Sequence, residues 1–567
     1  MSAKSVCVVG AGVAGVAALK ECVRQGFHPV CYELDSDIGG IWRRKDYTKP
    51  TNTPAIYKNL VMNTSKFNSC YSDFPPLHED TPYQSADGMF QYLKRAIQHF
   101  DLEKYIHFNT RVIKIRKTSD HDTTGRWEVF TAKRGDDIAG DDLAGPRGDD
   151  LSLSRCHREV FDFVFVCAGY FKLPIYPDIP GMETFKGTVQ HSFNYTSPTC
   201  YDEQNVLVVG KGLTAIDVAS DIGHLAKQVY IAMADGTWII PRCHGKVPAI
   251  DMLFTRDILH SEAKIVKLND LLIKLANARL DHESSGIRPT NPPLFSGIAA
   301  CDDIQLQILS GRVKTYEGLA RMEGDKAHFT DGQIVSGIDA VVFCTGYSPD
   351  LSFLDVHIID DDGKMELYKM IFPLHEKHHT LALIGCFGAD GPLAVCLENA
   401  ARLATRVMAG KHTLPSREEM KKDIDHWNTH TFIRRGNYKS YFLNAQLLSD
   451  STAYEIGCYP SFWKIFFRDP VLAFRSHYGS PYAAHYRLLG PDSQWEQVAH
   501  LCRVLYDEGS SSVRHRQPRK FQRPDVYQYN IFRSIRLLVV SSVIAAFGCL
   551  AYKYNSAVNK LMLGWFA

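Results

Sequence analysis

The 567-residue sequence lacks several features that would place it in a simple class. Its 64 Lys and Arg nearly balance 63 Asp and Glu, so no net basic field indicates nucleic acid as a partner. Its 15 cysteines are scattered, and no two of them are spaced C-x-x-C. This pattern disfavours a disulfide framework, a zinc ribbon and a dithiol redox centre, and no metal site is predicted. It fits a reduced, cytosol-facing environment.

Targeting signals are also sparse. The chain opens directly into a predicted strand, Ser5–Val9, without the basic and apolar regions of a secretory signal. Near the C-terminus, Leu537–Tyr552 carries no charge and has basic residues on both sides. Its 16 residues fall short of the roughly 20 that cross a bilayer. We expect the hydrophobic tail, residues 531–567, to form a membrane anchor or an interfacial helix; a buried C-terminal helix is the alternative.

What the sequence does have is two units that read strand, glycine turn, helix, strand. Its length exceeds the roughly 250–300 residues at which single cores stop growing, so two or three domains are expected. The first unit has strands at 5–9 and 29–33, and the second has strands at 205–209 and 228–232. Two such units about 200 residues apart predict an α/β fold with two Rossmann-type dinucleotide-binding domains.

The first glycine turn fits G-x-G-x-x-G. Gly10 allows the tight turn, Gly12 lets the backbone approach a pyrophosphate, and Gly15 lets helix and strand pack closely. The following helix start supplies free N–H groups to phosphates. Glu33 ends the second strand about twenty residues on, where a carboxylate can accept ribose hydroxyls. This unit therefore predicts a dinucleotide site.

The second turn departs from the pattern. It keeps Gly210 and Gly212 but has Ala215 where a third glycine would stand. No acid ends its second strand, and Asp235 comes a little beyond. A missing acid favours NADP over NAD, because a carboxylate would repel a 2′-phosphate. No arginine stands there either, so Lys211, Arg242 or Lys246 would have to bind that phosphate from elsewhere.

Two shorter patterns lie near these turns. Gly39-Gly40-Ile41-Trp42 follows Glu33 closely; its glycines allow approach to a cofactor and Trp42 can cover a ring. An ordinary turn with a core tryptophan is the alternative. The pattern Phe185-x-Gly187-x-x-x-His191-x-x-x-Tyr195 precedes the second unit. By residue type alone, core packing is its favoured interpretation.

The segments between the units are less regular. Residues 118–158 are polar and rich in Asp and Gly, which predicts a solvated hairpin loop. Core strands at 160–169 and 339–347 are expected to carry the chain out of one domain and back again. Residues 241–296, with a helix expected over 259–279, look like an insertion into the second unit.

Taken together, these motifs resemble those of the flavin-containing monooxygenases of the animal, microsomal type. The family's F-x-G-x-x-x-H-x-x-x-(F/Y) signature stands intact at Phe185, Gly187, His191 and Tyr195. Other similar stretches are Asn63–Lys66, Cys70–Pro75, Phe343–Tyr347 and Tyr486–Pro491. The resemblance runs from Ser5 to the C-terminus, apart from the polar insert.

The resemblance implies that FAD binds at the first turn and NADPH at the second. On the FAD side the implied residues are Gly10, Ala11, Gly12, Val13, Ala14, Gly15, Glu33, Gly40, Ile41, Trp42, Asn63 and Thr64. On the NADPH side they are Gly210, Gly212, Thr214, Ala215, Ile216 and Asp217, and the signature adds His191.

The implied activity is oxygenation of soft nucleophiles, such as amine nitrogen or thioether sulfur, with NADPH and O₂. In that family, reduced FAD and O₂ form a C4a-hydroperoxide, and bound NADP⁺ protects it. Asn63, whose amide can hydrogen-bond to this peroxide, is the one predicted catalytic residue; a turn-forming asparagine is the alternative.

The resemblance also implies a domain order. Residues 1–168 and 332–445 form a discontinuous FAD-binding domain around an inserted NADP-binding domain, 169–331. Residues 446–530 form a region that faces substrate or membrane, and 531–567 form the anchor. The implied location is the endoplasmic reticulum membrane with the catalytic domains facing the cytosol, and a homo-oligomer is left open.

Two departures from the family keep other functions open. Many members read G-x-G-N-S-G where this chain has Gly212-Leu213-Thr214-Ala215, which puts retention of NADP⁺ in doubt. At Glu398-Asn399 many relatives carry Gln-Gly, a change expected to affect the substrate side. The alternatives are an NADPH oxidase that yields H₂O₂, a Baeyer–Villiger monooxygenase of ketones, and a non-catalytic membrane flavoprotein.

Overall fold

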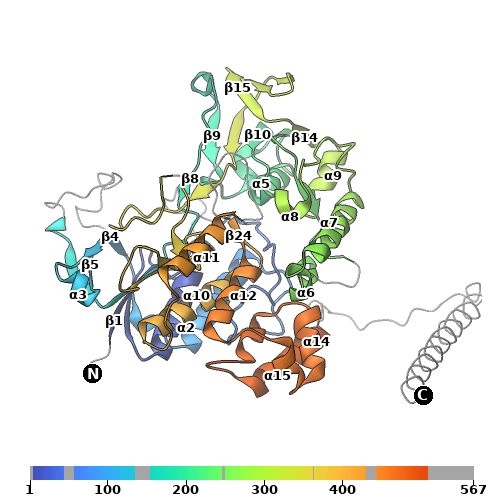
Figure 1. Cartoon of the computed structure of the whole chain (residues 1–567). Coiled ribbons are helices and arrows are strands. Elements are labelled where there is room, and N and C mark those ends of the chain that lie inside the picture. Colours follow the sequence, from blue (N-terminus) through green and yellow to red (C-terminus); the bar gives the residue numbers. More distant parts are fainter. Residues whose placement is uncertain are drawn as a thin grey trace, which may run out of the picture. The chain divides into compact units, whose positions relative to one another are not determined.

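Two parallel sheets organise the chain, as Figure 1 shows for the computed structural model. The structure describes residues 4–43, 56–133, 153–244, 249–361, 363–429 and 442–508. Within these ranges, no helix is both long and apolar enough to cross a bilayer. The predicted anchor at 531–567 lies outside them.

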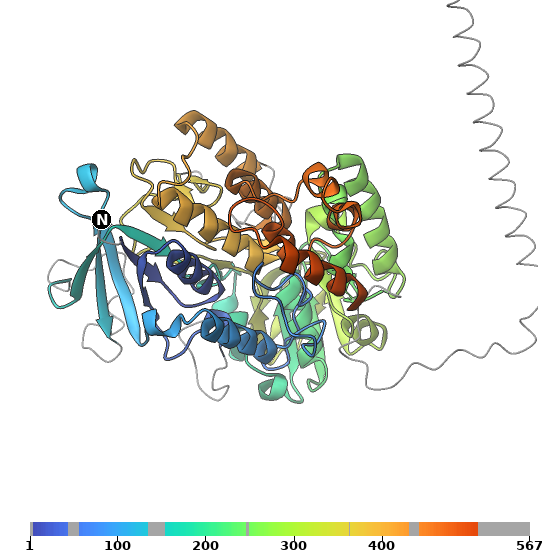
Figure 2. The same ribbon diagram turned by 90° about the horizontal axis from the view of Figure 1, so that it is seen from below.

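The first sheet joins strands from both ends of the chain. Its order is β22-β7-β1-β2-β3 and every pairing is parallel. The strands are β1 (Ser5–Val9), β2 (His28–Tyr32), β3 (Ile106–His107), β7 (Phe163–Val166) and β22 (Leu381–Leu383). Dark blue and yellow-orange elements therefore share one body in Figure 2. We call this body the first lobe.

The second sheet is built from the middle of the chain. Its order is β14-β11-β10-β18-β9, again all parallel. The strands are β9 (Thr188–His191), β10 (Asn205–Val209), β11 (Gln228–Ala232), β14 (Val313–Tyr316) and β18 (Ala340–Phe343). With helix α5 (Leu213–Ile222) it forms the second lobe. The two parallel sheets with their helices confirm the predicted α/β class.

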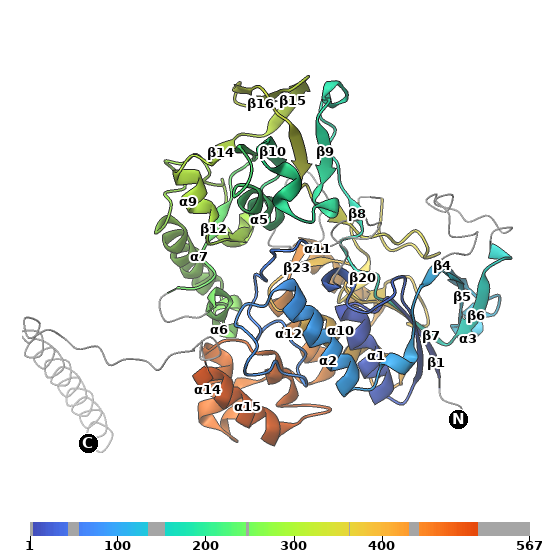
Figure 3. The same ribbon diagram turned by 180° about the vertical axis from the view of Figure 1, so that it is seen from behind.

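Helices of the first lobe pack closely because their facing residues are small. Helix α1 (Val13–Arg24) is rich in alanine and packs against α10 (Leu393–Met408), which in turn packs against α12 (Ala445–Ile456). Figure 3 shows α1 and α10 with α2 (Ala86–His99) around the sheet. The buried sheet and these helices share one hydrophobic core.

The prediction of a solvated loop over 118–158 is wrong for part of that segment. Strand β5 (Trp127–Lys133) is the middle of an antiparallel sheet with β4 (Thr110–Lys117) and β6 (His157–Phe161). Trp127 is fully buried, and its ring N–H donates to Thr380 Oγ1 at 2.9 Å. The alternation of large apolar residues in 127–132 was the missed signal, and 134–152 lie outside the described residues.

The predicted insertion at 241–296 carries the helix expected there. Helix α7 (Glu262–Asn277) lies with α6 (Arg256–Leu259), α8 (Pro293–Ser296) and the parallel pair β12 (Trp238–Ile240) and β13 (Ile298–Ala300) around a separate small core. In the described part of the chain the other α-helices are α3 (His121–Thr124), α9 (Ile304–Leu309), α11 (Arg417–Thr429), α13 (Phe462–Phe466), α14 (Pro470–Tyr478) and α15 (Trp495–Glu508). The other strands are β8 (Leu173–Pro174), β15 (Leu319–Glu323), β16 (Lys326–Phe329), β17 (Ile334–Val335), β19 (Tyr347–Ser348), β20 (Leu367–Tyr368), β21 (Phe372–Pro373), β23 (Gly388–Asp390) and β24 (Phe442–Asn444).

Candidate functional site

The first glycine turn connects β1 to α1 in the way its spacing predicts. Gly10 has a φ of +96°, and a Cβ there would lie 2.8 Å from the Cys167 carbonyl oxygen. A Cβ on Gly15 would lie only 1.8 Å from the Gly10 carbonyl oxygen, so only glycine fits. Gly12 begins α1 without a side-chain cap, and no acid lies in the first turn of the helix. Its free N–H groups therefore favour an anion such as a pyrophosphate.

Glu33 closes this turn from the end of β2. Its two carboxylate oxygens accept the backbone N–H groups of Ala11 at 2.6 Å and Asp35 at 2.8 Å. Burial raises the pKa of Glu33, although both hydrogen bonds oppose that shift. Each carboxylate oxygen has a second lone pair, which leaves acceptor capacity for a ribose hydroxyl. This agrees with the role predicted for Glu33.

The Gly40–Trp42 segment forms a 3₁₀ turn against the same glycines. The N–H of Gly39 donates to the Ala11 carbonyl at 2.9 Å. Gly40 has a φ of +56°, and a Cβ on it would lie 3.3 Å from the Cα of Gly12. Trp42 is partly buried against the first core. The two turns thus form a backbone cradle without side chains at its centre, which fits the close approach of a dinucleotide.

The second glycine turn connects β10 to α5 and has alanine in place of its third glycine. Gly210 has a φ of +143°, and Gly212 begins α5 without a side-chain cap or an acid in the first helical turn. Ala215 is fully buried, and its methyl group would lie 3.3 Å from a Cβ on Gly210. The helix start is again open to an anion. Thr214 is half-buried beside it, whereas Ile216 packs into the second core and donates its N–H to Gly212.

Residues 57–68 connect the two lobes. The Tyr57 hydroxyl donates to Asp217 on α5 at 2.8 Å, and the Lys58 N–H donates to the Thr196 carbonyl at 3.0 Å. At the other end of this loop, Asp251 of the insertion accepts the N–H of Ser65 at 2.7 Å. The loop is therefore held from both sides, and Asn63 lies within it.

Arg242 orients Asn63. Its guanidinium donates to the Asn63 side-chain oxygen at 3.0 Å and to the Met62 carbonyl at 3.3 Å, and it lies 3.6 Å from the Asp217 carboxylate. Burial raises the pKa of Asp217 despite this cation. Since Arg242 binds the amide oxygen, the Asn63 NH₂ group is the end that remains as a donor. Arg242, one of three cations considered from sequence as a phosphate ligand, bonds this loop and Asp302 here, and its contact with a phosphate stays a prediction.

A mostly apolar cavity opens beside Asn63. Its walls come from the 63–68 loop, the second turn, the insertion, and the start of α10. It is lined by Asn63, Thr64, Asn68, Leu213, Ile240, Ile250, Asp251, Phe254, Leu259, Ile265, Pro293, Leu294, Gly297, Ile298, Ala300, Asp390, Gly391, Pro392, Leu443, Asn444, Gln446 and Pro481. Apolar walls with few polar groups are typical of sites for small organic ligands.

The His191 signature has a packing role in the described structure. Phe185 lies in a core, and a Cβ on Gly187 would lie 2.2 Å from the Asp339 carbonyl oxygen. The Tyr195 hydroxyl donates to Asp221 at 2.6 Å. His191 ends β9 with no exposed surface, and burial lowers its pKa to about 4. Its neutral ring lies 5.0 Å from that of Tyr347, and contact with a cofactor stays a prediction.

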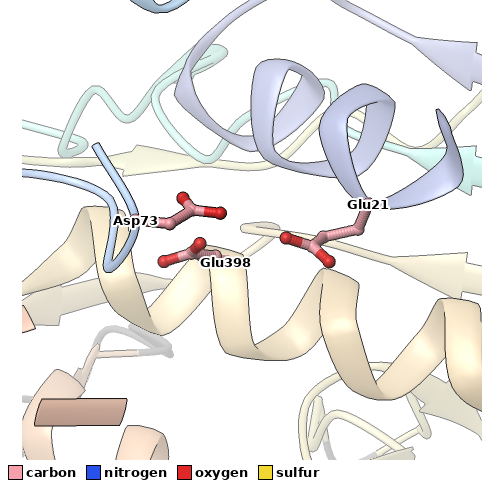
Figure 4. Close-up of side chains that lie close together, drawn as sticks. All are labelled: Glu21, Asp73 and Glu398. Carbon is pink, nitrogen blue, oxygen red and sulfur yellow. The ribbon is translucent and has the colours of Figure 1, made fainter. Parts of the chain in front are cut away.

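Three carboxylates that the sequence did not group together meet in the core of the first lobe. Glu21 of α1, Asp73 and Glu398 of α10 point toward one another in Figure 4. Lys20 lies among them, with its Nζ 2.6 Å from Asp73 and 3.1 Å from Glu21. The Arg487 guanidinium lies 2.8 Å from Glu398 and 3.0 Å from Asp73. These two cations occupy the space that a metal ion would need.

The cluster brings together stretches that lie far apart in the sequence. Burial alone would raise the pKa of Glu398, but Lys20 and Arg487 outweigh it and hold that pKa well below its usual range. Asp73 and Arg487 lie in the stretches 70–75 and 486–491. Glu398 and Asn399 are fully buried, and neither lines the cavity, so the expected effect of this segment on the substrate side is not supported. Charged residues inside otherwise apolar helices, Glu21 and Glu398, were a further signal in the sequence.

The chain matches a family model described as flavin-binding monooxygenase-like over residues 3–547. It is 35% identical to mouse dimethylaniline monooxygenase (N-oxide-forming) 2 over 503 residues, which cover 87% of this chain and 90% of that protein. It is 33% identical to human flavin-containing monooxygenase 2 over 556 residues, which cover 96% and 99% of the two chains.

Solved structures share the fold at lower identity. An S-allyl-L-cysteine S-oxygenase from Allium sativum superposes with a TM-score of 0.57 at 20% identity, covering 89% of this chain and 99% of that one. A structure titled as OTEMO in complex with FAD and NADP gives the same TM-score at 15% identity, with coverage of 80% and 98%. These likenesses support the arrangement of the two lobes.

Proposed function

The chain belongs to the flavin-binding monooxygenase-like family, and we propose that it uses FAD, NADPH and O₂ to oxygenate soft nucleophiles. The observation that carries this proposal is the cavity, which touches the Asn63 loop and the second glycine turn together. The relatives named for N-oxide formation and S-oxygenation indicate amines and thioethers as the substrate class. The predicted alternatives remain as outcomes of the test below.

We assign FAD to the first turn and the nicotinamide cofactor to the second. The glycine cradle at 10–15 and 39–40 fits a dinucleotide because no side chain fills it. Bound FAD, once reduced, supplies the activation of O₂. We propose residues 1–168 and the segment from the end of β18 to residue 445 for the FAD-binding domain, and 169 to the end of β18 for the NADPH-binding domain. The predicted boundary at 331/332 is moved beyond β18 because β18 pairs with β10 in the second sheet. Strand β22 supports the return to the first domain, because it pairs with β7.

Asn63 is the proposed catalytic residue. Arg242 holds its side-chain oxygen, so its NH₂ group is left to donate at the cavity wall. A donor there can stabilise negative charge that develops on oxygen during transfer. The apolar lining excludes water from the same space. The chain thus contributes orientation, one hydrogen bond and a dry site.

The test measures how NADPH consumption divides among products. The purified, FAD-loaded enzyme is mixed with NADPH, O₂ and a thioether, a tertiary amine or a cyclic ketone, and oxygenated product and H₂O₂ are both quantified. We expect about one sulfoxide or N-oxide per NADPH. Stoichiometric H₂O₂ with every substrate would show an oxidase, and lactone formation with the ketone alone would show a Baeyer–Villiger enzyme. Asn63→Ala should raise the H₂O₂ share, whereas Asn59→Ala, on the same loop, should not.

We further propose that the C-terminal region, 446–530, rests on a membrane, at the endoplasmic reticulum, to which the tail attaches the chain. Five large side chains on or beside α13 and α14 are at least half exposed: Trp463, Phe467, Val471, Phe474 and Tyr478. Lys464 and Arg468 lie exposed among them. Aromatic residues mixed with basic ones are typical of surfaces seated at lipid headgroups.

Vesicle binding of the full chain tests this attachment. Trp463→Ser with Phe467→Ser should weaken sedimentation with vesicles of phosphatidylcholine and phosphatidylserine. The control is Leu306→Ser with Leu309→Ser, which removes two equally exposed apolar residues of α9 in the second lobe. Equal loss in both pairs would contradict a specific membrane face.

A further inference from the structure

An ion pair stands beside the second glycine turn. Lys211, the residue between the two glycines, places its Nζ 2.7 Å from the Asp235 carboxylate. The other Asp235 oxygen accepts the Thr290 N–H at 3.0 Å and lies 3.3 Å from the Thr290 hydroxyl. Both members of the pair are about three-quarters buried. The carboxylate is therefore held in a defined place against the turn.

The pair corresponds to the Glu33 arrangement of the first lobe. There, the acid after β2 accepts from Ala11, which is the residue between the first two glycines. Here, Asp235 accepts from the side-chain ammonium of Lys211, although the position that directly follows the strand, as Glu33 does, is Met233. In dinucleotide-binding folds an acid at this edge faces the adenosine ribose. The sequence analysis noted Asp235 a little beyond the strand, and the structure brings its carboxylate back to the second turn from three residues beyond β11.

The charge of this pair bears on the 2′-phosphate that distinguishes NADPH from NADH. Burial alone would raise the pKa of Asp235, but the hydrogen bonds from Lys211 and Thr290 outweigh it and lower that pKa. The carboxylate is thus ionised at neutral pH. It repels a phosphate and also neutralises the one turn residue whose cation could attract it.

We propose that the Lys211–Asp235 pair cancels the usual selection for a 2′-phosphate, so that the chain accepts NADH as well as NADPH. The inference rests on the proposed function for the presence of a nicotinamide cofactor, and it concerns only which form is bound. Removal of the acid frees Lys211 and creates a preference for NADPH. Removal of the lysine leaves an uncompensated acid and creates a preference for NADH.

Equilibrium binding to the oxidised, FAD-loaded enzyme tests this without catalysis. Titration calorimetry with NADP⁺ and NAD⁺ should give dissociation constants within about tenfold of each other for the wild type. Asp235→Asn should tighten NADP⁺ about tenfold and leave NAD⁺ within about threefold, since one like-charge contact at partial exposure is of that order. Lys211→Gln should weaken NADP⁺ by a similar factor. Asp331→Asn, an exposed acid elsewhere in the second lobe, is the matched control.

The outcomes separate this inference from the proposed function. A wild-type preference for NADP⁺ above a hundredfold, unchanged in Asp235→Asn, would overturn the inference while oxygenation with NADPH continued. Similar binding of both nucleotides, with no oxygenated product from either, would support the inference and overturn the proposed function. Flavin reduction by NADH at a rate near that by NADPH would support the inference further.

Discussion

The two glycine turns look alike in sequence and differ in how closely they are packed. At the first, a Cβ on Gly15 would overlap the Gly10 carbonyl oxygen, so helix and strand approach as near as backbone allows. At the second, Ala215 carries a methyl group, and Gly210 has a more extended φ. Each turn also has an acid beside it. At the first turn Glu33 accepts the backbone N–H of Ala11, and at the second turn Asp235 accepts from the side chain of Lys211. The two turns thus differ in how closely the helix approaches the preceding strand at the third position.

Replacing the third residue of each turn with the residue that the other turn has there should give the largest effect on stability. Gly15→Ala forces a methyl group into the Gly10 carbonyl, and we expect a loss of about 3 kcal/mol in the free energy of unfolding. Most of the flavin should be lost as well. The reciprocal change, Ala215→Gly, should cost only about 1 kcal/mol, the helix propensity of glycine. Chemical denaturation measures the free energy of unfolding, and flavin absorbance measures the bound FAD. Equal effects of the two substitutions would show that the two turns do not differ in packing.

Removal of the acid should weaken cofactor binding at the first turn and strengthen NADP⁺ binding at the second. Glu33→Gln leaves either Ala11 or Asp35 with its N–H facing an NH₂ group, a mismatch of about 2 kcal/mol. We expect FAD affinity to fall about thirtyfold, measured by equilibrium dialysis. Glu103→Gln, an exposed acid in the first lobe, serves as the control. If Glu33→Gln bound FAD more tightly, as expected for NADP⁺ with Asp235→Asn, the two acids would not differ.

Acid should destabilise the second lobe through His191, in addition to other buried histidines such as His485, whose pKa burial also lowers. Because burial lowers the pKa of His191 to about 4, the unfolded chain takes up a proton before the folded one does as pH falls below about 6.5. Stability should therefore drop by about 2 kcal/mol between pH 7 and pH 5 on this account. His191→Asn, whose oxygen can replace Nδ1 as acceptor for Phe193, should lose less over that interval. If His191→Asn and the wild type lost the same stability as pH falls, with exposed His157→Asn as the reference, His191 would be excluded as the source of this pH dependence.

The parts of the fold that sequence predicted well depend on near neighbours. Glycine spacing, strand hydrophobicity and the acid at Glu33 lie within about thirty residues, and their backbone geometry allows few solutions. The helix expected over 259–279 is present as α7 for the same reason. Strand β5 was missed because the Asp and Gly content of its surroundings masked a short apolar alternation.

The parts of the fold that the sequence did not predict depend on contacts between residues that lie far apart in the chain. Lys20, Asp73, Glu398 and Arg487 share one buried cluster although they span most of the sequence, and no local pattern pairs such charges. Arg242 has no motif, and its contact with Asn63 exists because the insertion folds back onto the first lobe.

The order of residues alone established two dinucleotide turns, the α/β class and the family resemblance, since each rests on local backbone constraints or on motif identity. Only the folded structure shows which acid lies beside the second turn, which residue orients Asn63, and which cations balance the buried carboxylates. Charges are placed by long-range packing, which brings residues within hydrogen-bond distance whatever their separation along the chain.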